Sequence, residues 1–310
     1  MNACEVLVAG EYFCDLVFAG LEGPPRLGSE HMAEALTIMP GGTYTMALAL
    51  TRLGLDIRWA NSFGNDLFSR FVREMADQDG INGAAFTLLD EPVQRVSVAY
   101  AAQGERGFIS FSQPAVTPPP PAIAEAIKPI WLLQTFRFEP DWLDFVAGRK
   151  AAGAKVLLDC RGGDFDLTTP GVAELIGQAD IFSPNLEEAC RLTGAHDAAT
   201  AGERLRRLCP VVVLKCGADG ARIHGAGAPM SCPAPQVEVI DTVGAGDSFN
   251  AGLLLGLLRG YDLQEAVDWA VLCGSLSTIA TGGRACPTVE ALEVFRRDLA
   301  GFRPGTVVNQ

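Results

Sequence analysis

The sequence has few basic residues and no cluster of them. Only four of its 310 residues are lysine, and 37 acidic side chains against 24 lysines and arginines give a formal net charge of −13. A chain of this charge repels polyanions such as nucleic acid and the anionic surface of a membrane. We therefore expect no nucleic-acid or membrane partner, and any small anionic ligand must be held by local donors.

Metal and disulfide patterns are also missing. The nine cysteines include no C-x-x-C pair, and the three histidines, His31, His196 and His224, show no zinc spacing. These features favour reduced thiols in the cytoplasm. No basic region precedes the apolar residues 5–10, which are typical of a first strand rather than a signal peptide. No apolar run approaches the roughly 20 residues that a membrane helix needs.

Apolar strands alternate with amphipathic helices over the C-terminal two-thirds of the sequence. This pattern, with 48% hydrophobic residues, predicts one α/β domain around a mostly parallel sheet flanked by helices. Each helix is expected to follow a strand, as right-handed crossovers require. The predicted strands are 129–133, 155–159, 180–182 and 210–214, and the predicted helices are 141–152, 171–176, 186–193, 199–208, 247–259, 263–280 and 289–299.

Two earlier stretches break this rhythm. Residues from about 12–40 and 93–113 lack the helical period and include short alternating segments, which predict strands of a small separate sheet. The proline-rich residues 114–121 then return the chain to the main body, as a stiff spacer in preference to a ligand for a proline-binding partner. We expect a single domain over residues 1–310 that carries this small sheet.

The stretch 239–254, V-I-D-T-V-G-A-G-D-S-F-N-A-G-L-L, combines an anion site with a carboxylate. Gly244 and Gly246 let the backbone approach a ligand, and the following helix begins with N–H groups that have no internal partner. These donors suit a phosphate, and Asp247 suits a base that accepts a proton from a neighbouring hydroxyl. Taken alone, the stretch fits an acidic helix cap equally well.

The whole stretch resembles the C-terminal signature of the PfkB, or ribokinase-like, family of carbohydrate and nucleoside kinases, D-T-x-G-A-G-D-x-F, at every fixed position. The resemblance extends from about residue 6 to residue 299. It implies a ribokinase-like α/β fold with a small β-sheet lid over the body, ATP and Mg²⁺ as cofactors, and a homodimer formed through the lid.

The same resemblance implies roles for individual residues. Asp247 would be the catalytic base, and Gly244, Ala245 and Gly246 would form the anion hole. Asp241 and the Val243 carbonyl, with the loop 281–284, would hold a monovalent cation such as K⁺.

Residues 40–54, P-G-G-T-Y-T-M-A-L-A-L-T-R-L-G, place Gly41 and Gly42 at the mouth of a helix. Spacing alone indicates a simple hinge equally well. The stretch resembles the first family signature, G-G-x-x-x-N-x-A-x-x-x-x-R-L-G, whose glycine amides meet the sugar. One residue is missing after the glycines, and Thr45 stands where asparagine is usual, so a hydroxyl replaces an amide. The resemblance makes Gly41, Gly42 and Thr45 acceptor-binding residues.

Two aspartates elsewhere in the N-terminal part have different expected roles. Asp15 lies where family members use an aspartate to bind sugar hydroxyls, and a carboxylate can accept two hydroxyl protons from a diol. Without the resemblance, a solvated loop aspartate is the simpler interpretation. Asp66 lies in a turn that resembles a structural family motif, and it is predicted at a helix N-terminus rather than on a ligand.

Asn185 and Glu188 open the predicted helix 186–193 and lie three residues apart on one face. Their oxygens suit Mg²⁺ bound through water. The same spacing predicts a capping box, with Asn185 as the N-cap, and both functions can hold at once. The pair matches the family motif N-x-x-E, which organises Mg²⁺ and phosphates, whereas Glu187 is expected to face solvent.

Lys215 ends a buried strand at the carboxyl edge of the sheet, where ligands bind in parallel α/β folds. Together with Gly217 and Gly220 it matches the nucleotide segment [TK]-x-G-x-x-G of the family. Arg161, after the strand 155–159, lies where relatives often carry an arginine near the phosphates, and we expect it to approach them.

These residues predict an ATP-dependent kinase that phosphorylates a hydroxyl, a primary alcohol, of a sugar or sugar acid. A nucleoside kinase of the same fold is the alternative, because the altered sugar motif leaves room for a base. A non-catalytic protein that senses ATP or a sugar is a further alternative, which the intact Asp247 disfavours. A dehydrogenase is disfavoured because no G-x-G-x-x-G follows the first strand.

Overall fold

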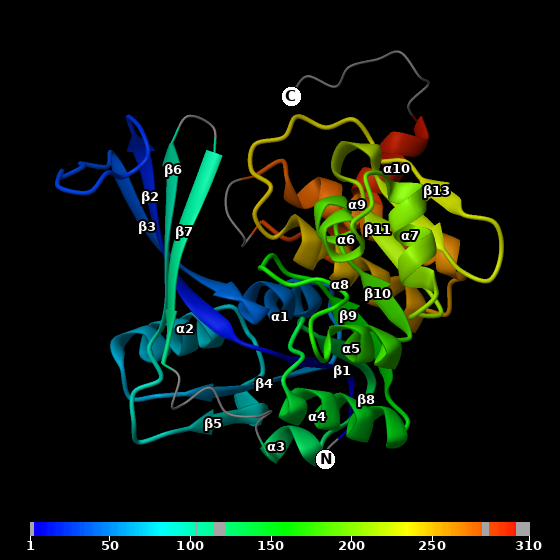
Figure 1. Ribbon diagram of the computed structural model, residues 1–310, viewed down its shortest axis with the longest axis horizontal. Coiled ribbons are helices and arrows are strands. Elements are labelled where there is room, and N and C mark those ends of the chain that lie inside the picture. Colours follow the sequence, from blue (N-terminus) through cyan, green and yellow to red (C-terminus); the bar gives the residue numbers. More distant parts are fainter. Residues whose placement is uncertain (1–2, 103–104, 114–121, 281–284, 302–310) are drawn as a thin grey trace.

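A large sheet and a small sheet organise the protein in this computed structural model, which describes residues 3–102, 105–113, 122–280 and 285–301 (Figure 1). The large sheet has nine strands in the order β13-β12-β11-β10-β9-β8-β1-β4-β5. Its pairs are parallel except at one edge, where β12 is antiparallel to both neighbours. The strands are β1 (Ala3–Ala9), β4 (Ile57–Phe63), β5 (Phe86–Leu88), β8 (Lys128–Gln134), β9 (Lys155–Asp159), β10 (Ile181–Ser183), β11 (Val212–Lys215), β12 (Ala221–His224) and β13 (Met230–Cys232).

The small sheet, called the lid below, stands apart from the large one at the side of α1 (Figure 1). It contains β3 (Ala35–Gly42), β2 (Tyr12–Leu21), β6 (Arg95–Ala102) and β7 (Glu105–Ser112) in that order. The separate sheet predicted from the sequence is therefore confirmed. The proline-rich connector 114–121 lies outside the described residues.

Helices cover both faces of the large sheet. Successive residues of each strand point to opposite sides, so the apolar strands present an apolar surface on both faces. Val6 and Val8 of β1 join a core with α1, α2, α8, α9 and α10, whereas Leu7 and Ala9 join a core with α3 to α7. The helices are α1 (Thr43–Arg52), α2 (Leu67–Gln78), α3 (Ala122–Glu125), α4 (Pro140–Ala151), α5 (Val172–Gln178), α6 (Leu186–Thr193), α7 (Ala198–Arg206), α8 (Ala245–Leu258), α9 (Leu263–Ser277) and α10 (Val289–Gly301).

The expectation that each helix follows a strand is wrong for α7, α9 and α10. Each of these follows another helix, because α6 and α7 pack as a pair and α8, α9 and α10 cover one face in succession. A helix that packs on a neighbouring helix can bury its apolar side without a strand between them. None of the helices in the described residues is long and apolar enough to cross a membrane.

Two glycines allow α8 to lie very close to α9. A Cβ atom at Gly252 would lie 2.7 Å from the Cβ of Cys273, and a Cβ at Gly256 would lie 2.7 Å from the Cα of Ala266. Real side chains do not tolerate such distances, so the close packing of the two helices depends on glycine at both positions. This packing fixes the start of α8, which faces the carboxyl edge of the sheet.

Candidate active site

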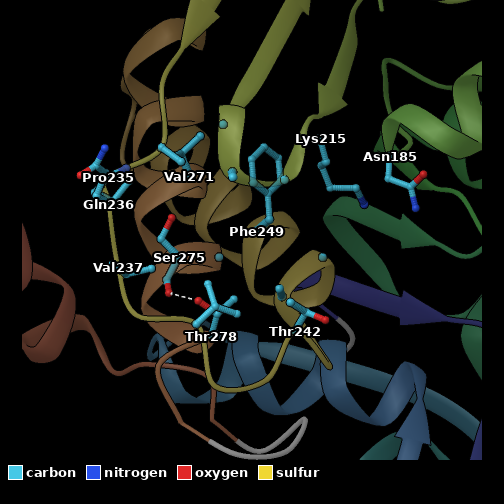
Figure 2. A pocket seen from close by; sticks show the side chains of 18 of the residues that line it. Asn185, Lys215, Pro235, Gln236, Val237, Thr242, Phe249, Val271, Ser275 and Thr278 are labelled. Atoms are coloured by element: carbon cyan, nitrogen blue, oxygen red, sulfur yellow. Dashed lines mark hydrogen bonds between the residues drawn. The ribbon is translucent and has the colours of Figure 1, made fainter. Parts of the chain in front are cut away.

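The carboxyl ends of the parallel strands bring the predicted site residues to one edge of the sheet. Asp159 ends β9, Asn185 follows β10, and Lys215 ends β11. Together with Gly246 of α8 they line a pocket of about 780 Å³ (Figure 2). The crossover topology therefore assembles in space what the sequence separates, as expected for this class of sheet.

The start of α8 forms the floor of this pocket at its polar end. The helix begins after Gly244, which has a φ of 77°, and no side chain of the described residues caps it. The Ala245 N–H donates to the Thr242 carbonyl at 3.2 Å, so this expected member of the anion hole is already paired. The neighbouring N–H of Gly246 and the positive end of the helix are left for a ligand. A Cβ at Gly246 would lie 3.5 Å from the Nζ of Lys215, so the lysine ammonium lies above the same turn.

A chain of hydrogen bonds holds Lys215 in place. Its ammonium donates to Oδ1 of Asp159 at 2.8 Å, the amide of Asn250 donates to the same oxygen at 2.7 Å, and the hydroxyl of Ser183 donates to Asn250 at 2.8 Å. Burial alone would lower the pKa of Lys215, but Asp159 and Glu188 outweigh it and raise that pKa. The lysine is therefore charged and points a fixed positive group at the pocket.

Asp247 lies in the first turn of α8, next to Gly246. Thr45 of α1 donates a hydrogen bond to its Oδ2 atom. Burial raises the pKa of Asp247 to about 7, and the charge of Asp159 adds to this, whereas Thr45 and Lys215 oppose it. A carboxylate with this pKa can accept a proton near neutral pH and release it again.

The predicted acceptor-binding residues lie on the lid and at the start of α1. A Cβ at Gly41 would lie 2.0 Å from Oδ2 of Asp15, so glycine makes room for that carboxylate, and burial raises the pKa of Asp15 to about 6. Gly42 has a φ of 63°, and a Cβ there would lie 2.5 Å from the carbonyl oxygen of Glu11. Thr45 connects this group of residues to Asp247.

The capping box predicted for α6 is confirmed. The Asn185 side chain accepts a hydrogen bond from the Glu188 N–H at 2.8 Å, and Glu188 accepts one from the Asn185 N–H at 2.8 Å. Both residues also line the pocket, and burial raises the pKa of Glu188. A cation near this carboxylate would offset its burial, so the donors fit a Mg²⁺ ion. Glu187 is exposed, as expected.

The predicted nucleotide segment after β11 contains two glycines with positive φ. Gly217 has a φ of 58° and Gly220 a φ of 84°, and both line the pocket. Arg161 does not line it: its Nε donates to the Phe136 carbonyl at 3.0 Å, and its guanidinium lies over the ring of Phe165. The expected approach of Arg161 to the phosphates is therefore not supported by its position.

The structure describes Asp241 and Val243 of the expected monovalent cation site. Oδ1 of Asp241 accepts a hydrogen bond from the Val243 N–H at 3.0 Å, and the Thr278 carbonyl accepts from the N–H of Asp241 at 3.1 Å. The turn thus holds the Asp241 carboxylate next to the loop that leads into α8. The loop 281–284 lies outside the described residues.

Several residues of the pocket were not predicted from the sequence. Asn250 does not line the pocket itself but donates a hydrogen bond to Asp159, which does. It lies three residues after Asp247 in a buried turn of α8, and an amide in such a place is a usable signal because it needs a partner. The wall at the other end of the pocket gave no such signal, because part of it comes from the irregular chain between β13 and α8 and part from α9. Figure 2 shows this wall, formed by Pro235, Gln236, Val237, Val271 and Ser275, with Phe249 between it and Lys215 in that view.

Chemically, the pocket offers an apolar end for a flat ring and a cationic end, with unpaired amides, for phosphate groups. A carboxylate poised to take a proton lies at the border between this end and the acceptor-binding residues. The fold and the site together define an α/β enzyme that moves a phosphate group to a hydroxyl.

Comparisons with known proteins agree with this class. Residues 6–290 match the family model described as pfkB family carbohydrate kinase. Aminoimidazole riboside kinase of Salmonella typhimurium is 31% identical over 285 residues, which cover 83% of this chain and 87% of that protein. 1-Phosphofructokinase of Haloferax volcanii is 29% identical over 282 residues, 86% of this chain and 88% of that protein.

A solved structure shows the same fold. The structure of Arabidopsis thaliana ribokinase complexed with ribose and ATP superposes with a TM-score of 0.82 at 23% identity, covering 94% of this chain and 98% of that chain. The protein belongs to the pfkB family of carbohydrate kinases. It is an ATP-dependent carbohydrate kinase with the ribokinase-like fold, which confirms the family, fold and activity predicted from the sequence.

Proposed function

We propose that Asp247 is the catalytic base of this kinase and that phosphate transfer takes place at the start of α8. The observation that carries the proposal is the position of Asp247. Its carboxylate contacts Thr45 on the acceptor side, and Lys215 of the nucleotide pocket lies above the preceding residue, Gly246. A proton acceptor at this border is where an acceptor hydroxyl and a terminal phosphate must meet.

In this mechanism the ionised Asp247 accepts the proton of the acceptor hydroxyl as the hydroxyl oxygen attacks the terminal phosphorus of ATP. The bond from that phosphorus to the bridging oxygen breaks, and ADP leaves. The N–H groups of Gly244 and Gly246 stabilise the negative charge that develops on the phosphate oxygens. Lys215, held by Asp159, adds a fixed positive charge on the same side. The backbone donors are already oriented by α8, so they need no reorganisation during the reaction.

The nucleotide occupies the pocket with its phosphates at the Lys215 end, where Gly217 and Gly220 bring the backbone close. Asn185 and Glu188 would hold Mg²⁺ through water molecules. The ion supplies neutralisation of charge between the phosphates. Asp241 and the Val243 carbonyl provide oxygen donors for a monovalent cation such as K⁺ beneath the loop that leads into α8.

The acceptor binds between the lid and α1, with its primary alcohol toward Asp247. Asp15 accepts hydrogen bonds from two neighbouring hydroxyls, and Gly41 and Gly42 provide backbone contacts, while the Thr45 hydroxyl lies between these residues and Asp247. The half-buried position of Asp15 makes an unpaired carboxylate unfavourable, which favours a ligand that offers a diol. A sugar or sugar acid meets these requirements.

A riboside is a second candidate acceptor, supported by one exposed aromatic side chain. Asp15 pairs with Ser97, and the Ser97 and Ser110 hydroxyls lie 2.8 Å apart, so these residues share one face of the lid. Phe108 lies two residues from Ser110, on that same face, and is 63% exposed. A planar base can stack on such a ring. The relative from Salmonella typhimurium is named as a riboside kinase.

The opposite face of the lid supports a homodimer. Cross-strand pairing places apolar residues of all four strands on this face, and many of them are exposed. We propose that a second copy of the chain covers this face. Its most exposed members are Leu36, Ile38, Ile109 and Phe111.

The compartment proposed for the enzyme is the cytoplasm. All nine cysteines are present as free thiols, and most of them are buried among apolar side chains. A reducing environment preserves such thiols.

A panel of acceptors assayed for ADP release tests the proposed substrate class. Ribose, fructose, sugar acids and ribosides are compared with the wild-type enzyme and with Asp15→Ala. The variant is expected to lose on the order of 1–3 kcal/mol per lost contact in kcat/KM for the acceptor, with the KM for ATP unchanged. An unchanged acceptor profile would place the acceptor site elsewhere.

The same panel separates the two acceptor classes. Phe108→Ala is expected to lower kcat/KM for ribosides by about tenfold while that for free sugars is kept, since stacking on a ring contributes on the order of 1 kcal/mol. Equal effects on both classes would contradict a role for Phe108 in binding a base.

A further inference from the structure

The hydroxyl of Thr45 lies between two oxygen atoms from separate elements, Gly42 at the end of β3 and Asp247 in α8. It contacts the carbonyl oxygen of Gly42 at 2.8 Å and also Oδ2 of Asp247. Thr45 itself is only 5% exposed, so water does not compete freely for these contacts. A hydroxyl has one hydrogen to donate and two lone pairs with which to accept. The number of donated bonds is therefore smaller than the number of neighbouring acceptors.

The charge of Asp247 decides how this hydrogen is used. A carbonyl oxygen and an ionised carboxylate can only accept, so Thr45 can donate to one of them while Asp247 is ionised. When Asp247 is protonated, its O–H can donate to Thr45, and Thr45 can donate to Gly42. Both contacts are then hydrogen bonds of the correct polarity. The hydroxyl group is suited to both states because it can donate and accept.

We propose that Thr45 is a positioning residue for the base. Its hydroxyl holds Oδ2 of Asp247, leaves Oδ1 for the acceptor hydroxyl, and moves its donated hydrogen bond between Asp247 and Gly42 as the base loses or gains a proton. This inference rests on the proposed role of Asp247. It also assigns a function to the threonine that stands where the family signature has asparagine.

The surroundings of Thr45 hold its hydroxyl in a fixed position relative to Asp247. The residue lies in the first turn of α1, where its hydroxyl can reach the carbonyl three residues earlier, and its branched Cβ limits its rotamers. Helices α1 and α8 pack directly against each other. The distance between the hydroxyl and the base is therefore set by two packed helices rather than by a flexible loop.

Other groups also face Asp247. Asp159 and Lys215 act on its charge, and the thiol of Cys286 is close enough to respond to it. All three stay unchanged when only Thr45 is replaced. A change in pH dependence on substitution of Thr45 can thus be assigned to its hydroxyl, which lowers the pKa of Asp247 in the native enzyme.

The test compares Thr45→Val, which keeps the shape but loses the hydroxyl, with Thr45→Ser, which keeps the hydroxyl. The readout is kcat/KM for the acceptor as a function of pH. For Thr45→Val the acidic limb is expected to move up by about one pH unit, and kcat at its plateau to fall about tenfold. Thr45→Ser is expected to restore the limb to the wild-type pH. An unmoved limb in a folded Thr45→Val enzyme would overturn the proposal.

A double substitution distinguishes action through the base from direct contact with the acceptor. If Thr45 acts through Asp247, Thr45→Val is expected to have no further effect on the residual kcat of Asp247→Asn. A further loss that appears only in the KM of the acceptor would assign Thr45 to acceptor binding instead. Full activity of Asp247→Asn itself would show that the proposed base, rather than Thr45, is misassigned.

Discussion

Asp247 combines a raised pKa with a place at the start of a helix, and both properties can be measured. Only the ionised form can act as a base, and burial raises its pKa to about 7. We therefore expect kcat/KM for the acceptor to rise about tenfold per pH unit up to pH 7 and to level off above it. Asp247→Asn is expected to lower kcat by about 10²-fold or more, with ATP still bound.

The same residue is expected to reduce stability at neutral pH. Its pKa is about 7 in the folded protein against an ordinary value of 3.8, so folding favours its neutral form. The protonated Asp247 therefore stabilises the folded protein in full below pH 3.8, and this contribution is lost as the pH rises through 7. Asp247→Asn should therefore raise the melting temperature relative to wild type most above pH 7 and least near pH 4. A gap that does not grow with pH would contradict the raised pKa.

Sequence patterns predicted the site residues whose signal is local. Gly244, Gly246 and Asp247 share one turn, and Lys215 ends one strand, so short motifs and their resemblance to the family signatures were enough to single them out. The hydrogen bonds from Asn250 and Lys215 to Asp159 join segments far apart in the chain, and the Thr45–Asp247 contact crosses between two helices. Such contacts depend on tertiary packing, which no local pattern records.

At the level of single elements, the capping box and the proposed Mg²⁺ site share the start of α6, and one variant can separate them. Glu188→Gln keeps an oxygen that accepts the hydrogen bond from the Asn185 N–H but removes the charge. We expect a melting temperature close to wild type and a higher Mg²⁺ concentration for half-maximal rate. Glu187→Gln, on the exposed side of the same helix, is the matched control and should change neither.

If Glu188→Gln lowered the melting temperature and left the Mg²⁺ titration unchanged, the capping box would be its only function. Glu188→Ala, which loses both the charge and the cap, is expected to lower stability by about 1 kcal/mol in addition.

Two glycine substitutions, one in the contact between α8 and α9 and one on the exposed side of α4, are expected to change stability in opposite directions. A Cβ at Gly256 would meet the Ala266 backbone, which cannot move aside, whereas a Cβ at Gly148 in α4 would meet nothing within 4 Å. Gly256→Ala is expected to destabilise the protein by about 1–3 kcal/mol. Gly148→Ala is expected to stabilise it by roughly 0.5–1 kcal/mol, through helix propensity. Denaturant unfolding measures both, and a stabilising Gly256→Ala would show that the helices lie further apart.

For the whole molecule, the apolar face of the lid predicts a dimer that charge can separate. Ile109 and Phe111 are 67% and 50% exposed on this face. The double variant Ile109→Glu/Phe111→Glu is expected to sediment as a monomer where the wild type sediments as a dimer, because two charges would be buried at the interface. A lid dimer would be excluded by a monomeric wild type, or by a dimer that survives this variant.

The overall fold was predicted from the sequence more completely than its edges. Strands such as 155–159 are apolar runs bounded by polar residues, and the structure reproduces that strand as β9. The hairpin of β12 and β13 was not predicted, because Met230–Cys232 is three residues long and carries no measurable period. Short edge strands are defined by their partners, so their pairing becomes visible only in the folded molecule.

The glycines of α8 have a further consequence for how the active site comes into being. Gly252 and Gly256 weaken the intrinsic helicity of α8, each by roughly 0.5–1 kcal/mol relative to alanine, so that helix depends on α9 to persist. The amide protons of both helices should then exchange with solvent as one cooperative unit. During synthesis, the acceptor-binding residues leave the ribosome long before Leu263–Ser277. We therefore expect a nascent chain to form the turn at residues 244–247 only when the second helix of this pair emerges.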